Sequence, residues 1–377
     1  MSSSRTGLSG DRFPRGTLII VGLAAAVVVS TGMAAIRGIL APVLLTLVLT
    51  ICAYPIRVRL QRRGASGAIG TGAVMLTVAG LLAAFVVVFA IAFGQFVAML
   101  PTYSDQIDQA LAGFSAWLSS IGVGSDEIHG VVTTLDPSKI AGVVSGLLGS
   151  VFSLTTSAVI VFTMIITMGA DSAHAGTILK QLSARRPELV DAIRDYSANV
   201  RRYMVVTTLL GVAQGTLNTI TLLILHVPAA LLWGLLSFLC SFIPNVGYFF
   251  AIAPPLAFGF LVGGWPTVIA IIVIYSVINA VVQSVIQPRV VGEAVSLSQT
   301  ITFFSVLFWA VVIGPIGAIL AIPLTLFGKA VLVDADQGVR WWAPVLGPTD
   351  ETREITRTDG LAVKDARKHP GTDERAA

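Results

Sequence analysis

Charge is scarce in this chain: Asp, Glu, Lys and Arg make up 12% of its 377 residues, while hydrophobic residues make up 55%. A typical soluble domain carries about 25% charged residues, so this composition excludes an ordinary soluble fold. A β-barrel is excluded as well, because its strands would alternate polar and apolar over ~10 residues, and the runs here do not alternate. The chain is predicted to be an all-α polytopic membrane protein.

Residues that carry chemistry are also few, with two cysteines and four histidines in the whole chain. Cys52 and Cys240 both lie in apolar runs without the spacing of a disulfide or metal pair, which is typical of small core residues. No histidine has a second ligand at helical or hairpin spacing, and no nucleotide-binding, metalloprotease or hydrolase motif is present. The sequence therefore predicts no enzyme activity, no cofactor, no metal and no nucleic-acid partner.

Long apolar runs fill most of the chain, and a spanning helix needs ~20 apolar residues. The candidates are residues 17–35, 38–54, 68–100, 141–168, 203–226, 229–243, 247–263, 266–287 and 300–333. These runs predict a polytopic membrane helix bundle of about eight spans, with broken or re-entrant helices in the C-terminal half. The first two runs are separated by Arg37 and Gly38 alone, which predicts a tight helical hairpin.

The last run, 300–333, is too long for one crossing. At 1.5 Å per residue it would extend about 50 Å, against a hydrocarbon core of ~30 Å. Gly314, Pro315 and Gly317 near its middle predict two helices that fold back there and return the C-terminus to the cytoplasm. A single kinked span, which would place the C-terminus outside, is the alternative.

Charged segments between the runs indicate sidedness through the positive-inside rule. Residues 55–67, read as a loop, carry four arginines and no acid, and the N-terminal tail, 1–16, is basic as well. Both are therefore predicted to be cytoplasmic. Residues 101–140 carry five acidic side chains and one lysine, and they are predicted to lie outside and to contain a short amphipathic helix. Residues 171–202 predict a cytoplasmic amphipathic segment whose helix continues into the next span.

Proline and glycine, rather than charge, interrupt the apolar runs of the C-terminal half, where only Arg289 and Glu293 are charged in residues 203–328. Pro244 removes a backbone donor and Gly247 allows a positive φ. The stretch between them predicts a re-entrant or unwound segment whose backbone faces a cavity. An ordinary turn between two short spans is the alternative.

Two further interruptions follow this predicted break. Pro254 and Pro255 are expected to interrupt the run 247–263 as well, which favours the re-entrant interpretation over the ordinary turn. By contrast, Gly263-Gly264-Trp265-Pro266 predicts a plain interfacial turn between two spans.

Side-chain amides recur at helical spacing inside the same runs. Asn279, Gln283 and Gln287 are four residues apart and line one face of a helix. Gln214 and Asn218 do the same on another span. Because lipid offers no hydrogen-bond partner, buried amides need one from elsewhere. The pattern predicts either a polar track along a substrate path or interhelical hydrogen bonds that hold the bundle together.

Acidic residues are missing from every predicted span. Carriers coupled to protons or sodium usually rely on intramembrane carboxylates to hold the coupling ion. A carboxylate proton relay is therefore not predicted for this chain, although coupling through backbone carbonyls and amides stays open.

Three stretches of the C-terminal half combine these features in a distinctive way. They are Phe242 to Gly247 with Pro254-Pro255, then Asn279 to Gly292 followed by Val295 and Leu297, and finally Gly314 to Leu324. In these stretches the chain resembles the autoinducer-2 exporter (AI-2E) family of bacterial permeases. The resemblance implies a multi-pass inner-membrane protein that transports small molecules, with quorum-signal export and sodium/proton antiport both claimed for relatives. Members often carry an acidic residue where this chain has Asn279 and Gln283, which weakens the antiport assignment.

The leading hypothesis is a transporter, an exporter of a small polar organic molecule such as a quorum-sensing signal. The substrate path is expected to include Asn245, Asn279, Gln283, Gln287, Gln214 and Asn218. Hinges and gates are expected at Pro244, Gly247, Pro288, Arg289, Gly292, Gly314, Pro315 and Gly317. Arg289 would either contact an anionic group of the solute or anchor the inner interface of the membrane.

Two alternatives stay open: a sodium (cation)/proton antiporter, and a non-transporting membrane scaffold. The expected partners are the lipid bilayer and a small-molecule substrate, and a homo-oligomer is left open. The permease domain, 17–333, is expected in the cell inner membrane, between a cytoplasmic N-terminal tail, 1–16, and a mostly disordered C-terminal tail, 334–377.

Overall fold

The structure, a computed structural model, describes residues 15–120, 160–171, 174–244, 246–287 and 297–335. Within these ranges every regular element is a helix. In chain order the elements are α1 (Arg15–Ala35), α2 (Arg37–Arg62), α3 (Gly67–Met99), η1 (Leu100–Tyr103), α4 (Ser104–Ser120), α7 (Ala175–Ser183), α8 (Pro187–Ile224), α9 (Ala230–Cys240), α10 (Gly247–Asn279), η2 (Ala280–Ile286), α12 (Gln299–Ile313), α13 (Pro315–Ile319), α14 (Ala321–Lys329) and η4 (Ala330–Asp334). A further helix occupies Ile160–Asp171.

Several sequence predictions fall outside the described residues. They concern both tails, most of the predicted span 141–168, Asn245, Pro288, Arg289 and Gly292.

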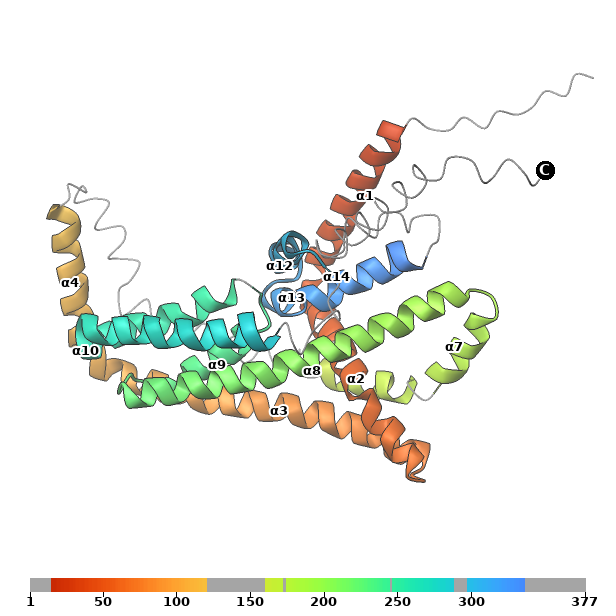
Figure 1. Cartoon of the computed structure of the whole chain (residues 1–377), viewed down its shortest axis with the longest axis horizontal. Coiled ribbons are helices and arrows are strands. Elements are labelled where there is room, and N and C mark those ends of the chain that lie inside the picture. Colours follow the sequence, from red (N-terminus) through yellow and green to blue (C-terminus); the bar gives the residue numbers. More distant parts are fainter. Residues whose placement is uncertain (1–14, 121–159, 172–173, 245, 288–296, 336–377) are drawn as a thin grey trace, which may run out of the picture.

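Four of the described helices are long and apolar enough to cross a membrane. By length and composition they are Arg37–Arg62, Gly67–Ile107, Pro187–Ile224 and Gly247–Gln283, the last of which reverses at Gly264. Large hydrophobic side chains are exposed along α1, α3 and α10, which suits a surface that faces lipid tails rather than water. The predicted all-α membrane helix bundle is thus confirmed (Figure 1).

The start of the chain differs from its prediction, because α1 and α2 do not form a tight hairpin. Only Ile36 separates them, and its φ of −104° and ψ of 16° leave the chain direction nearly unchanged. The bonds Ile36 N to Gly32 O, at 3.3 Å, and Leu40 N to Ile36 O, at 3.0 Å, carry the helical pattern across the joint. Reversal would need residues that abandon this pattern, and neither Arg37 nor Gly38 does. In Figure 1, α2 accordingly continues from α1 as a kinked rod.

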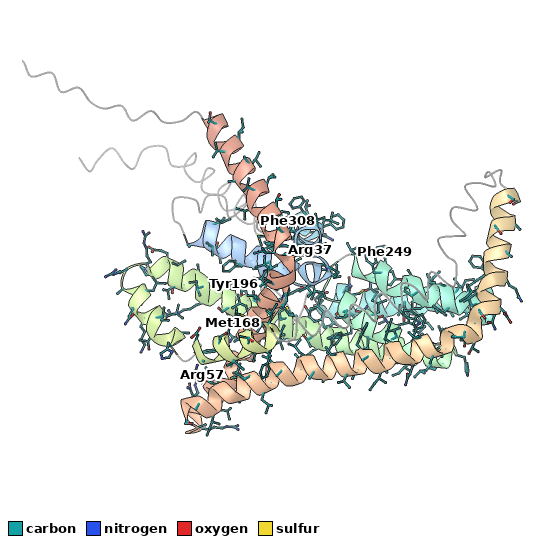
Figure 2. All side chains as sticks on the ribbon, turned by 180° about the vertical axis from the view of Figure 1, so that it is seen from behind. Arg37, Arg57, Met168, Tyr196, Phe249 and Phe308 are labelled. Atoms are coloured by element: carbon teal, nitrogen blue, oxygen red, sulfur yellow. The ribbon has the colours of Figure 1, made fainter. Side chains whose placement is uncertain are left out.

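The predicted loop at residues 55–67 is mostly helical. Helix α2 passes through Pro55 and ends at Arg62, and the chain turns at Gly64, which has a φ of +87°. Arg57 is 5% exposed because α3 packs against it, and a Cβ at Gly70 would lie 2.9 Å from the Arg57 side chain. Figure 2 shows Arg57 at this corner between α2 and α3.

Helix α8 is the central helix of the bundle. As predicted, its amphipathic first part runs without a break into the next span. Tyr196 and Val200 face inward, and they join a core with residues of α2 and of the C-terminal helices. Tyr196 packs edge-on against Phe327 of α14, with ring centroids 5.5 Å apart.

Helices α8 and α9 are antiparallel and pack at glycine contacts. A Cβ at Gly215 would lie 2.7 Å from the carbonyl oxygen of Gly234, and one at Gly234 would lie 2.8 Å from that of Gly215. Gly211 faces Ser241 and Phe238 in the same way. Gly211 and Gly215 form a GxxxG motif, which lets membrane helices approach closely.

The predicted break after α9 is present. Helix α9 ends at Cys240 and α10 begins at Gly247. Gly247 is required for a reason other than the one expected, because its φ is not positive. Instead, a Cβ there would collide with the Cys240 carbonyl, so a glycine permits the tight reversal. With 11 residues, α9 extends about 16 Å and is too short to cross a ~30 Å core.

A second reversal divides α10 in two. At Gly264, φ is 60° and ψ is −154°, and the hydroxyls of Tyr248 and Ser276 lie 2.8 Å apart. A straight helix would separate these residues by about 42 Å, so the halves 247–263 and 265–279 are antiparallel. The predicted turn at residues 263–266 is confirmed.

The predicted interruption at Pro254-Pro255 is wrong, because helix α10 passes through both residues. The fixed φ of proline fits a helix, and each proline removes one backbone donor. Neighbouring helices make such losses tolerable in membrane proteins.

The last apolar run folds back on itself, as predicted. Gly314 adopts a φ of +87° between α12 and α13, and Pro315 begins α13. Trp309 Nε1 donates a hydrogen bond to Thr325 Oγ1 at 3.0 Å, so α12 and α14 lie against each other. A Cβ at Gly317 would collide with the Trp309 carbonyl.

Candidate functional site

Helix α8 and the second half of α10 form an antiparallel pair that positions the amides. Gln214 Nε2 donates a hydrogen bond to Asn279 Oδ1 at 3.4 Å. Two turns further along each helix, Leu222 and Ile271 share a buried core cluster. The Gln214–Asn279 bond sets an antiparallel register in which the numbers of opposed residues add to the same value, and the shared cluster of Leu222 and Ile271 fits that register. Polar side chains that the sequence places on two separate helices thus meet on facing sides.

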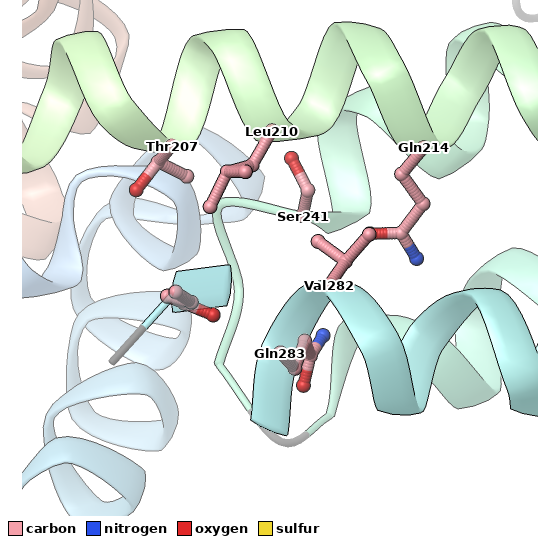
Figure 3. A pocket seen from close by; sticks show the side chains of 7 residues that line it. Thr207, Leu210, Gln214, Ser241, Val282 and Gln283 are labelled. Atoms are coloured by element: carbon pink, nitrogen blue, oxygen red, sulfur yellow. The ribbon is translucent and has the colours of Figure 1, made fainter. Parts of the chain in front are cut away.

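A pocket opens beside this pair, one to two helical turns from the Gln214–Asn279 bond. Seven described residues line it: Thr207, Leu210, Gln214, Ser241, Val282, Gln283 and Gln287. Figure 3 shows side chains from α8, from the turn after α9 and from the helix formed by α10 and η2 around one small space. The site therefore lies where the tip of the α9–α10 hairpin meets two long helices.

The helix changes its winding at the pocket. Residues Ala280–Ile286 form a π-helical segment, η2, and the backbone N–H of Gln287 bonds to the carbonyl of Val282, five residues earlier. Short π segments inside α-helices occur frequently at functional sites. Here the wider winding sets the direction in which Gln283 and Gln287 leave the helix.

The chemistry of the pocket is uncharged. The described residues that line it offer hydroxyls, amides and apolar side chains, and none of them is ionisable. Gln214 is 4% exposed, and its Oε1 has no hydrogen-bond partner among the described residues. A buried amide oxygen without a partner costs ~1–3 kcal/mol. The site is therefore suited to accept a hydrogen bond from a neutral polar molecule.

The pocket is small and partly open. The space among its side chains has room for about one water molecule. A solute larger than water can enter only if the hairpin tip or the α10–η2 helix moves relative to α8.

The second hairpin, α12 to α14, packs against the tip of the α9–α10 hairpin. Ile243, in the turn after α9, packs against Val306 and Ala318 of that hairpin. Phe242 lies in the same core cluster as Val312 and Leu320. Because packed interiors transmit strain, movement of one hairpin tip would displace the other.

The structure brings most of the predicted path residues together. Gln214, Gln283 and Gln287 line the pocket, Asn279 bonds to Gln214, and Asn218 follows Gln214 by one turn and is 1% exposed. Pro244 and Gly247 lie in the turn that carries Ser241. The three predicted hinge residues Gly314, Pro315 and Gly317 are not in the lining; they lie in the second hairpin.

Four lining residues were missed by sequence reasoning: Thr207, Leu210, Ser241 and Val282. Thr207 and Leu210 precede Gln214 by seven and four residues, so extending the face of Gln214 and Asn218 backward would have found them. Ser241 and Val282 carry no such signal, because only the packing of the hairpin tip places them here.

No group of three or more His, Cys, Asp or Glu side chains in the described part of the chain could hold a metal ion.

Comparison with known proteins gives one family. The family model described as AI-2E family transporter matches residues 18–335. The AI-2 transport protein TqsA of Escherichia coli K12 is 24% identical over 317 residues, which cover 84% of this chain and 92% of TqsA. The putative transport protein YhhT of the same organism is 25% identical and covers 88% of this chain and 95% of its own length. A putative transport protein of Haemophilus influenzae is 24% identical, with 88% and 97% covered.

Proposed function

Because this chain belongs to the AI-2E family of transporters, and is therefore a multi-pass membrane transporter of a small molecule, we propose that it exports a neutral, polar organic molecule. The solute would pass between α8 and the α10–η2 helix. Gln214, Gln283 and Gln287 would form hydrogen bonds with it, and the hairpin tip at Ser241 would open and close the way. A quorum-sensing signal is a solute of this class, and a relative carries AI-2 in its printed name.

One observation carries the proposal: amides from two helices converge with a hairpin tip on a small space whose described lining bears no charge. An ionic solute would need an opposite charge in such a site, because burying an unpaired ion is costly. A neutral solute needs only donors and acceptors, which the lining supplies.

The hairpin tip supports the same mechanism. Helices that end inside the membrane expose backbone groups, and such groups are tolerated where they line a cavity. Ser241 lies in this non-helical stretch and in the pocket lining. The hydrophobic contact of Ile243 with the second hairpin would make Gly314 and Gly317 a remote hinge rather than part of the path.

The test is solute flux through purified protein in liposomes. The panel contains AI-2, ribose, glycerol and sodium ions, each loaded inside the vesicles. We expect efflux of at least one neutral, hydroxylated solute. Replacing Gln283 and Gln287 together by Leu should lower that efflux about tenfold or more, because two hydrogen bonds of ~1 kcal/mol each to the solute are removed.

The matched control is Gln95→Leu, which removes an exposed amide of α3 that lies away from the pocket. This variant should transport like the parent protein. If the Gln283 and Gln287 double variant inserts normally and keeps full efflux, the path is wrong. If the parent protein moves no solute of the panel, the exporter proposal itself is wrong.

The cation/proton antiporter is the alternative that the same panel tests. Sodium-dependent pH changes without flux of a neutral solute would favour it. The described lining holds no carboxylate that could bind and release a proton, so we place this alternative second. Unchanged behaviour of every variant would favour the scaffold.

A further inference from the structure

The polar face between α8 and the second half of α10 continues beyond the pocket. Gln214 meets Asn279, and one turn further along both helices the same register sets Asn218 opposite Tyr275. Both residues are 1% exposed. Tyr275 is a path residue that amide spacing could not reveal, because it is an aromatic residue in an apolar run.

The pair Asn218 and Tyr275 is left without the hydrogen-bond partners that a structural role would require. Asn218 Oδ1 and the Tyr275 hydroxyl form no hydrogen bond with the described residues by distance and angle. Ser237 of α9 faces the Tyr275 hydroxyl and donates its own proton to Trp233 O at 2.9 Å. Its oxygen keeps lone pairs that could accept from Tyr275, but the distance and angle between the two groups do not meet those of a hydrogen bond. Two buried polar groups without a hydrogen-bond partner, each one turn from the Gln214–Asn279 bond, mark a place where a hydrogen-bonding guest is missing.

The pair is closed on both sides along the helices. Toward the pocket it is separated by the Gln214–Asn279 bond. Away from the pocket it is followed by Leu222 and Ile271, both 0% exposed and in one apolar cluster. The polar face therefore ends in an apolar plug, and from Thr207 to Asn218 it extends about 16 Å.

We propose that Asn218 and Tyr275 form a second subsite for the transported solute, reached from the pocket when the Gln214–Asn279 bond opens. The inference rests on the proposed function and adds an intermediate binding position along the transport path. The guest is a neutral molecule with hydroxyl groups: one hydroxyl donates to Asn218 Oδ1, and another accepts from the Tyr275 hydroxyl. The Gln214–Asn279 bond acts as the gate between the two subsites.

The first experiment measures access to the subsite. In a variant with Cys52→Ala and Cys240→Ala, Asn218→Cys is treated with the neutral, polar reagent 2-hydroxyethyl methanethiosulfonate. We expect the thiol to react, and ribose or AI-2 to slow the reaction at least threefold. Val200→Cys is the control, because Val200 lies on the same helix in a dry core and its thiol should not react.

The second experiment measures binding through transport. Tyr275→Phe removes a single hydroxyl and keeps the ring, so we expect the KM for efflux of AI-2 or ribose to rise about three- to tenfold, with unchanged protein in the membrane. Tyr248→Phe is the matched control. Its hydroxyl bonds to Ser276 at an exposed position on the hairpin, and its loss should leave KM unchanged.

Each outcome bears on one of the two proposals. Flux in the parent protein with an unreactive Asn218→Cys and a normal KM for Tyr275→Phe overturns the second subsite and leaves the exporter standing. If the thiol reacts but solute does not protect it, and the KM of Tyr275→Phe is normal, then water alone occupies the site. That result also overturns the second subsite. If no solute of the panel moves, the exporter proposal fails, whatever the thiol does.

Discussion

At the scale of single residues, the amides could be predicted and their partners could not. Spacing of four placed Gln214 and Asn218 on one helix face, because the period of an α-helix is fixed by its backbone. The same spacing could not place Gln283 relative to Asn279, because the helix changes to π winding from Ala280. Which face meets which depends on the register between α8 and the second half of α10. That register is set by packing of residues such as Leu222 and Ile271, which look like any other apolar residues in the sequence.

For glycines, too, the sequence predicts some residues of a contact but not their partners. Gly211 and Gly215 have motif spacing that predicts close helix packing, but their partner, Gly234, has no signal of its own. Replacing Gly215 by Ala should destabilise the bundle by ~1–3 kcal/mol, because its Cβ would lie 2.7 Å from the Gly234 carbonyl oxygen. Thermal unfolding of the detergent-solubilised protein checks this as a lower Tm.

The control for that measurement is Gly94→Ala in α3. A Cβ at Gly94 meets nothing within 4 Å, and alanine favours a helix by ~1 kcal/mol over glycine. An unchanged or raised Tm is expected. Equal losses in both variants would mean that the α8–α9 contact is not as tight as the structure has it.

At the scale of elements, breaks were predicted better than continuity. Glycine with proline marked the reversals at Gly247, Gly264 and Gly314, because those positions demand close approach or a positive φ that other residues avoid. Proline alone misled, since Pro55 and the pair at 254–255 lie inside helices. A proline removes one donor, which a membrane helix can tolerate, whereas a reversal requires a backbone conformation that leaves the helical region, which a single glycine supplies at Gly264 and at Gly314.

The hairpin of α9 and α10 offers a test at this scale, because glycines lie at both of its turns. Gly247→Ala and Gly264→Ala should each cost ~1–3 kcal/mol, the first by collision with the Cys240 carbonyl and the second by its positive φ. Gly247→Ala should also lower efflux per folded molecule about tenfold or more, because it shifts the tip that carries Ser241 into the pocket.

Gly264→Ala supplies the comparison, since its turn joins the other end of the half-helix 247–263 and no described lining residue lies beside it. Efflux per folded molecule should stay near that of the parent protein. If both variants lose efflux in proportion to their loss of stability, the tip has no special part in transport.

At the scale of the whole molecule, composition alone established the class, while sidedness depends on charge. The prediction that the tail 1–16 and residues 55–67 both lie in the cytoplasm needs a hairpin between them, whereas α1 and α2 continue in one direction. What stays is the contrast between the acidic segment 101–140 and the basic segment 171–202. Figure 1 places α4 and α7, which belong to these segments, at opposite ends of the bundle.

The positive-inside rule therefore predicts that α4 lies outside the cell and α7 inside. In the variant without native cysteines, Ser119→Cys on α4 should react with a membrane-impermeant maleimide on intact cells. Ala184→Cys, just after α7, should react only after the cells are opened. Both positions are exposed, so access to the reagent depends on the membrane and not on burial.

Sidedness also decides the direction in which the pocket and the second subsite are met. With α7 inside, α8 runs outward from Pro187, so a solute leaving the cytoplasm would meet Gln287 and Gln283 first and the pair Asn218 and Tyr275 last. That order suits export, with the Leu222 and Ile271 plug as the outer closure. Labelling of Ala184→Cys on intact cells would reverse the order and turn the same path into one for uptake.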